Sequence, residues 1–144
     1  MNISRESRKT AGILLVILPT VIIGGVSILT LLINDPDYMA NKLRQDLWRA
    51  GHAHAGVLLL LSLITLRYVD EAKLNSKMKS LVRTFIPSAA VLLPLAFFFS
   101  VLDPEATEPN AMIYLAYAGA VVLITGLLIL GIGLLRSDTK ELKE

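Results

Sequence analysis

Four long apolar segments dominate the chain, and short polar segments separate them. The apolar segments are residues 11–33, 50–68, 81–102 and 111–135. A helix that crosses a bilayer needs about 20 apolar residues, because the hydrocarbon core is about 30 Å thick and a helix rises about 1.5 Å per residue. Lipid offers backbone amides no water partners, so each segment must be helical. The pattern predicts an all-α integral membrane protein, with one domain over residues 1–144 that forms a four-transmembrane-helix bundle.

The polar segment after the first span predicts a short amphipathic helix. Asp35 followed by Pro36 is typical of an N-cap with proline at the first helical position. Beyond them, Met39, Leu43 and Leu47 recur every fourth residue among charged side chains. We expect an interfacial helix of about three turns that lies on the outer membrane surface or extends the second span outward.

The distribution of Lys and Arg predicts the orientation of the bundle. Eleven of them flank one side of the predicted bundle and three flank the other. The side richer in Lys and Arg is usually cytoplasmic. We therefore expect a multi-pass protein of the cell (plasma) membrane with cytoplasmic N- and C-termini. The eleven are Arg5, Arg8, Lys9, Arg67, Lys73, Lys77, Lys79, Arg83, Arg136, Lys140 and Lys143, and the three are Lys42, Arg44 and Arg49.

Composition narrows the function classes. The net charge of +2 is accounted for by these flanking residues, and no basic stripe with interleaved aromatic residues is present, so we expect no nucleic-acid partner. The chain has no cysteine, which excludes disulfides, thiolate metal sites and cysteine nucleophiles. No nucleophile–base pair can be located, so the chain is expected not to be an enzyme.

Two seams of small residues predict where helices approach each other. Small side chains let helix backbones pack closely in lipid, and a spacing of seven keeps residues on one side of a helix. We expect both seams to lie inside one bundle, with packing against each other as one arrangement. The remaining small-residue surface also leaves a homo-oligomer or a larger membrane complex open. The seams consist of Gly119, Gly126 and Gly133 in the fourth span and of Gly51, Ala55 and Ser62 in the second.

Ionisable side chains inside a bilayer are costly and indicate function by default. The apolar spans contain no Asp, Glu or Lys, and both histidines of the chain, His52 and His54, fall at the start of the second span. On a regular helix the two project about 200° apart. They therefore cannot ligate one metal ion together, and a metal at His52 or at His54 would need ligands from other elements.

Other polar residues near the predicted outer face complete a candidate ligand-binding site. Such a cluster would suit a metal, a haem axial ligand, a quinone, a lipid headgroup or a proton relay. The alternative is structural: the tyrosines and arginine would anchor the interface, and the histidines would hydrogen-bond between helices. The candidate residues are Arg49, His52, His54, Asp103, Tyr114 and Tyr117.

Two resemblances bear on these alternatives. The Gly-His-x-His pattern within residues 51–56 resembles haem-ligating helices of heme–copper oxidase-like proteins. That likeness implies a haem whose second ligand would come from Met112 or another subunit. In length and number of spans the chain also resembles small four-helix multidrug transporters, but their intramembrane glutamate has no counterpart in residues 11–33.

The sequence therefore predicts a small non-enzymatic membrane protein, an accessory or ligand-binding protein with an outer-leaflet histidine site. A haem- or metal-associated redox membrane protein is one alternative. A small channel or facilitator is another. The cofactor, if any, stays open between haem and a metal ion.

Overall fold

The computed structural model describes residues 3–136, and all of its regular structure is helical. Four helices are long and apolar enough to cross a membrane, as predicted. Lys140 and Lys143, which entered the charge count, lie outside the described residues. The elements are α1 (Arg5–Asn34), α2 (Pro36–Ala40), α3 (Lys42–Tyr68), α4 (Ser76–Phe99), the 3₁₀ helix η1 (Ala111–Tyr114) and α5 (Leu115–Leu135).

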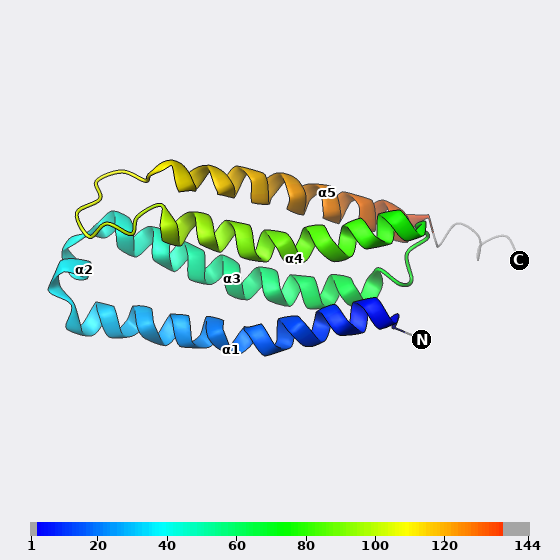
Figure 1. Cartoon of the computed structure of the whole chain (residues 1–144), viewed down its shortest axis with the longest axis horizontal. Coiled ribbons are helices and arrows are strands. Elements are labelled where there is room, and N and C mark those ends of the chain that lie inside the picture. Colours follow the sequence, from blue (N-terminus) through cyan, green and yellow to red (C-terminus); the bar gives the residue numbers. More distant parts are fainter. Residues whose placement is uncertain (1–2, 137–144) are drawn as a thin grey trace, which may run out of the picture.

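The four long helices lie side by side in the order α1, α3, α4, α5 (Figure 1). α4 contacts both α3 and α5 extensively, whereas α1 packs mainly on α3. α1 begins and α5 ends at one end of the bundle, which we call the terminal end. α2 and the connection 100–110 lie at the other end, the distal end.

The predicted amphipathic helix is divided in two. Asp35 caps α2 as expected, since its Oδ1 accepts hydrogen bonds from the backbone N–H groups of Asp37 and Tyr38, both at 3.0 Å. α2 ends after five residues, and the side chain of Asn41 accepts from the N–H of Arg44 at 3.0 Å to start α3. Residues 42–49 thus extend the second apolar helix, and a single helix of three turns does not form.

The other boundaries differ by less. α1 starts six residues before the apolar segment, because the Ser4 hydroxyl accepts from the Ser7 N–H at 3.2 Å and caps it. α4 begins at Ser76 and ends at Phe99, slightly ahead of residues 81–102. The predicted range 111–135 is matched by η1 and α5 together.

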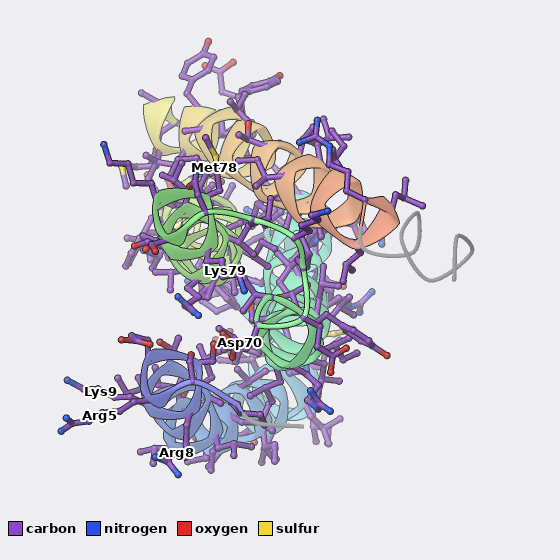
Figure 2. All side chains as sticks on the ribbon, turned by 90° about the vertical axis from the view of Figure 1, so that its right-hand side faces the viewer. Arg5, Arg8, Lys9, Asp70, Met78 and Lys79 are labelled. Carbon is purple, nitrogen blue, oxygen red and sulfur yellow. The ribbon has the colours of Figure 1, made fainter. Side chains whose placement is uncertain are left out.

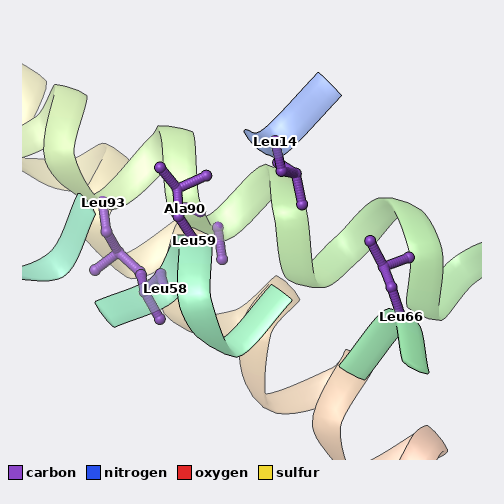
Figure 3. Packing of buried hydrophobic residues seen from close by; sticks show 7 residues of the cluster. Leu14, Leu58, Leu59, Leu66, Ala90 and Leu93 are labelled. Carbon is purple, nitrogen blue, oxygen red and sulfur yellow. The ribbon is translucent and has the colours of Figure 1, made fainter. Parts of the chain in front are cut away.

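The main apolar core lies between α3 and α4, and α1 adds one buried residue, Leu14 (Figure 3). A second cluster near the terminal end joins α4 and α5 through Ile86 and Leu130. Close van der Waals contact between these side chains holds the helices together. The main cluster comprises Leu14, Leu58, Leu59, Leu66, Ala89, Ala90 and Leu93.

The glycine seam of α5 packs against α4. A Cβ atom added to Gly119 would lie 3.0 Å from Leu93 Cγ, and one added to Gly126 would lie 2.8 Å from Ile86 Cγ1. At Gly133 an added Cβ would meet the side chain of the connecting residue Leu74 at 2.6 Å. A methyl group at any of these positions would force the facing side chain to shift, so glycine permits the close contact.

The seam of α3 also faces α4. A Cβ added to Gly51 would lie 3.0 Å from Phe98 Cε2, and Ser62 is fully buried. Because α4 lies between α3 and α5, the two seams do not meet each other. Seam-to-seam packing is therefore the wrong arrangement. Gly51, Gly119 and Gly126 receive bulky side chains from α4, and Gly133 receives Leu74 of the connection before α4.

Candidate functional site

His52 lies half-buried in the contact between α1 and α3. Its ring covers Gly25 of α1, where an added Cβ would come within 2.7 Å of Cε1 and 2.8 Å of Nε2. A side chain at position 25 would therefore require the imidazole to move from this place. Within residues 3–136, neither ring nitrogen of His52 makes a hydrogen bond. A polar ring is thus held in apolar surroundings without a partner from its own chain.

A cavity of about 260 Å³ adjoins this ring between α1, α3 and α4, and it is open to the surface at the exposed residues Thr20 and Val91. Its walls are mostly apolar, and the wall from α4 includes Pro94 and the aromatic ring of Phe98. The lining from α1 includes Thr20 and Gly24, and that from α3 includes His52 and Ala55. This site has the character of a small-molecule pocket, with apolar walls and a few polar groups.

Pro94 interrupts the backbone hydrogen bonding of α4 beside the cavity. Proline has no N–H, so the carbonyl oxygen four residues earlier, at Ala90, loses its ordinary helical partner. Ala90 is buried and lines the cavity. The Thr20 hydroxyl donates to the Ile17 carbonyl at 2.7 Å, which leaves its oxygen able to accept. His52 and Thr20 are thus the polar side chains that line the cavity.

An apolar trough of about 570 Å³ lies along α1 and α3 and also reaches His52. It follows α1 from Leu18 to Leu29, a rise of about 16 Å. Several lining side chains, including Ile22, Val26 and Val57, are exposed, so the trough opens to the side of the bundle. His52 is the only histidine, acidic or basic residue in either lining.

His54 has a different environment. Its Nδ1 lies 2.7 Å from the carbonyl oxygen of Ala50, and its ring centre lies 5.1 Å from that of Phe97 on α4. Since a carbonyl only accepts, Nδ1 carries the hydrogen in this contact. A ligating histidine is often held in this way. Among the described residues, however, no group of three His, Asp or Glu side chains gathers to hold a metal.

The six candidate residues do not form one cluster. Arg49 reaches Gln45 Oε1 at 3.4 Å, and Asp103 Oδ1 accepts from the N–H two residues later at 2.9 Å. Tyr114 and Tyr117 stack at 6.1 Å and are both exposed. This stacking is the only hydrogen bond, ion pair or ring contact among the six within residues 3–136. His52 and His54 project from opposite sides of α3 and so face different neighbours, Gly25 of α1 and Phe97 of α4.

An aromatic cluster surrounds Trp48, close to His52. Trp48 lies 5.6 Å from the buried ring of Tyr38 and 6.0 Å from that of Phe98, and its Nε1 donates to the Phe98 carbonyl at 3.3 Å. The Arg44 guanidinium lies 4.4 Å from the Trp48 ring centre. Trp48 and His52 are four residues apart on α3, so they share one helix face. This cluster connects α2 to the wall of the cavity.

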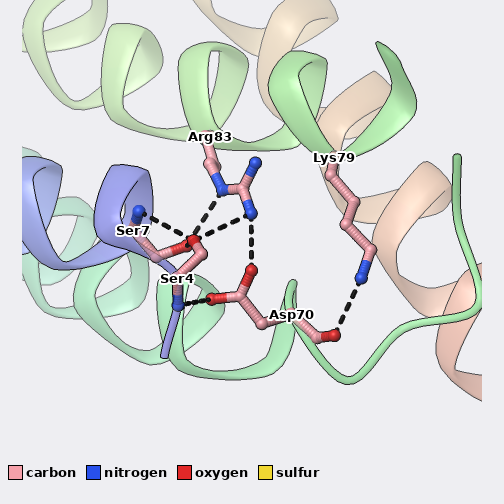
Figure 4. A network of polar contacts seen from close by, with 5 residues as sticks. All are labelled: Ser4, Ser7, Asp70, Lys79 and Arg83. Atoms are coloured by element: carbon pink, nitrogen blue, oxygen red, sulfur yellow. Dashed lines mark hydrogen bonds and ion pairs between the residues drawn. The ribbon is translucent and has the colours of Figure 1, made fainter. Parts of the chain in front are cut away.

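A polar network joins α1 to α4 at the terminal end (Figure 4). Arg83 Nε donates to the Ser7 hydroxyl at 2.9 Å, and its Nη2 donates to the Ser4 hydroxyl and to Asp70 Oδ1. The Ser4 N–H donates to Asp70 Oδ2 at 2.9 Å. Lys79 Nζ donates to the Asp70 carbonyl at 2.8 Å. The network ties the start of α1 to the segment between α3 and α4.

The charges in this network are shielded from solvent. The side chains of Arg83 and Asp70 are 14% and 12% exposed. Burial acts to raise the pKa of Asp70, but hydrogen bonds from the Ser4 N–H, Ser7, Arg83 and the Ser4 hydroxyl outweigh it and leave the pKa below its usual value. In the sequence, the basic residues of this connector indicate only the orientation of the bundle. The clue in the sequence is that Arg83 lies inside the third apolar segment and that Asp70 closely follows the second.

No protein-family model, curated protein or solved structure matches this chain. The likenesses to haem-ligating helices and to multidrug transporters thus gain no support from these comparisons.

Proposed function

We propose that the chain crosses the plasma membrane four times, with both termini in the cytoplasm. Support comes from the four apolar helices and from the unequal distribution of basic residues. Arg5, Arg8, Lys9 and Lys79 gather at the terminal end (Figure 2). In this orientation the distal end faces outward, and His52 lies about 4–5 Å deeper than Arg49 in the outer leaflet.

The protein acts, in this proposal, as a non-enzymatic accessory or ligand-binding membrane protein. Its ligand is a lipid-soluble molecule with a hydrogen-bonding head, which pairs with His52. One observation carries the proposal: the His52 ring has no hydrogen-bond partner within residues 3–136 and is flanked by a cavity and a trough. An unpaired polar group in apolar surroundings costs free energy that a ligand would recover.

The geometry favours a binding site over a channel. The exposed residues of the trough, among them Ile22 and Val57, belong to the outer surface of the bundle. A ligand dissolved in the bilayer would therefore enter sideways between helices and would not need a path along the bundle axis.

The proposal is tested by identifying the molecules that remain bound to the purified protein. Wild type would be isolated in polymer-bounded discs of native membrane, extracted with organic solvent and analysed by mass spectrometry. We expect a hydrogen-bonding lipophile in stoichiometric amount, well above its share of the bulk lipid. Gly25→Ala should lose it, because the new methyl group displaces the His52 ring.

The matched control is Gly12→Ala. Gly12 is on the same helix, but an added Cβ there meets nothing within 4 Å. Gly12→Ala should bind the same lipophile in the same amount as wild type. Identical extracts from wild type and Gly25→Ala would refute the proposed site.

A further inference from the structure

We propose that the terminal end of the bundle binds a phospholipid with an anionic headgroup, in a recess between α1 and α3 that Arg8 and Arg67 help to line. The phosphate lies at the two guanidinium groups, and one acyl chain runs along the contact between the helices. This site is separate from the one at His52. It shares with the proposed function only the insertion of the four helices into a membrane.

The recess combines apolar walls with two basic side chains, and its volume is about 170 Å³. Ser7 at one wall is buried, whereas Arg8 is exposed, so the recess opens to the surface where the arginine lies. Hydrocarbon surface next to positive charge is what an anionic phospholipid meets best at the boundary between its headgroup and its acyl chains. The apolar lining consists of Ile3, Ala11, Leu63 and Leu66.

The recess lies on the same side of the α1–α3 contact as the apolar trough. Ala11 of the recess and Leu18 of the trough are seven residues apart on α1, and so are Arg67 and Leu60 on α3. Seven residues nearly complete two helical turns, so each pair shares one side of its helix. From Arg8 to Leu18 the helix rises about 15 Å, half of the hydrocarbon thickness of about 30 Å. An acyl chain of one leaflet therefore reaches the start of the trough.

The charges at the recess favour an anionic headgroup. Within residues 3–136 the Arg8 side chain makes no hydrogen bond or ion pair, and it projects from α1 on the side away from α4 (Figure 2). Arg67 Nη1 lies 2.8 Å from Glu71 Oε1, so this carboxylate offsets one of the two positive charges. Glu6, the only acidic residue of α1, lines a different pocket together with Arg83 of α4. The recess thus keeps a net positive charge.

Guanidinium groups suit the phosphate of such a lipid. Their N–H donors form a planar fork that matches two phosphate oxygens. A zwitterionic phospholipid carries the same phosphate but also brings an ammonium group, which the positive charge of the recess repels. The preference between the two lipid classes therefore measures the site.

Arg5 provides a matched control on the same helix. It is exposed and carries the same charge at the same end of the bundle, but it does not line the recess. Its side chain points in a different direction from that of Arg8 (Figure 2). Replacing either arginine by glutamine removes one positive charge, so a general attraction to basic residues would respond equally to both changes.

Full-length protein in detergent micelles would be titrated with dioleoyl phosphatidylglycerol and, separately, with dioleoyl phosphatidylcholine, and bound lipid would be counted by native mass spectrometry. The first phosphatidylglycerol should bind about fivefold more tightly than phosphatidylcholine, the effect of one basic residue at an anionic membrane surface. Arg8→Gln should lose this preference and Arg5→Gln should keep it. Gly25→Ala, which disturbs only the His52 site, should also keep it.

Equal affinity of wild type for the two lipids would overturn the inference, and so would equal losses in Arg8→Gln and Arg5→Gln. Because Arg8 is exposed and has no side-chain partner within residues 3–136, its replacement should leave the fold intact, as shown by unchanged Trp48 emission. A preference that depends on Arg8, in a protein whose extract holds no lipophile lost by Gly25→Ala, would support this site while the proposed function fails. The reverse pair of results would refute this site alone.

Discussion

The polar network at the terminal end should contribute measurably to stability. We consider Asp70→Asn and Arg83→Gln, singly and together. α1 is the least buried long helix, with 11% of its most apolar window buried against 22–39% for the others. The hydrogen bonds of Arg83 to Ser7 and Ser4 therefore form a substantial part of its attachment.

The magnitude follows from the geometry. A hydrogen bond to a charged group contributes about 1.5–3 kcal/mol, and breaking a fully buried ion pair costs about 3–5 kcal/mol. The Arg83 and Asp70 side chains keep 14% and 12% of their exposure, so we take the lower part of this range. Each single variant should lose about 2–3 kcal/mol, and the double variant should show a coupling of about 1–2 kcal/mol.

The assay is unfolding in mixed micelles with increasing SDS at pH 7, followed by the fluorescence of Trp48. Trp48 lies near the start of α3 and against Tyr38 of α2, at the end of the bundle away from the network, so it reports unfolding of the bundle and not merely a local change at the network. Lys42→Gln is the control, because the Lys42–Asp46 pair is exposed and should be worth at most about 0.5 kcal/mol.

Protonation should mimic the substitution. The folded pKa of Asp70 is below its usual value, so its stabilising contribution is fully present above the unfolded-state pKa of about 3.9. It declines as the pH falls through the folded-state pKa. The difference between wild type and Asp70→Asn should thus stay constant from about pH 7 to about pH 5 and vanish in stronger acid. Single-variant losses no larger than that of Lys42→Gln, or zero coupling, would refute the reasoning.

Two further predictions concern packing and orientation. Gly126→Ala should destabilise the bundle by about 1–3 kcal/mol in the same assay, because its methyl group overlaps α4, whereas Gly131→Ala on the same helix meets nothing within 4 Å and should be neutral or slightly stabilising. In intact cells, a membrane-impermeant maleimide should label Thr107→Cys but not Lys77→Cys, since the chain has no other cysteine. Labelling of Lys77→Cys alone would invert the proposed topology.

Local sequence determined the parts of the fold that depend on neighbours along the chain. The number and approximate length of the long helices follow from the apolar segments. Asp35 and Pro36 correctly start α2, because an N-cap acts within a few residues. Asn41 caps the start of α3 in the same way. Its cap divides the helix that the spacing of Met39 and Leu43 predicts.

Tertiary structure decided which faces meet. The glycines at 119 and 126 predicted a close contact, but only the order of helices shows that α4 fills it. Likewise, helical geometry set the angle between His52 and His54, while the placement of α1 brought Gly25 against the His52 ring. The site at His52 needs three helices at once, and no local pattern specifies their order.

The network of Ser4, Asp70 and Arg83 illustrates the same limit. Its members are distant in sequence, so no periodicity relates them, and each residue alone has an ordinary role as a cap or a flanking charge. Local propensity and hydrophobic pattern act over a few residues and therefore determine elements and their boundaries. Partner choice depends on the packing of whole helices, so only the assembled bundle shows which side chains meet.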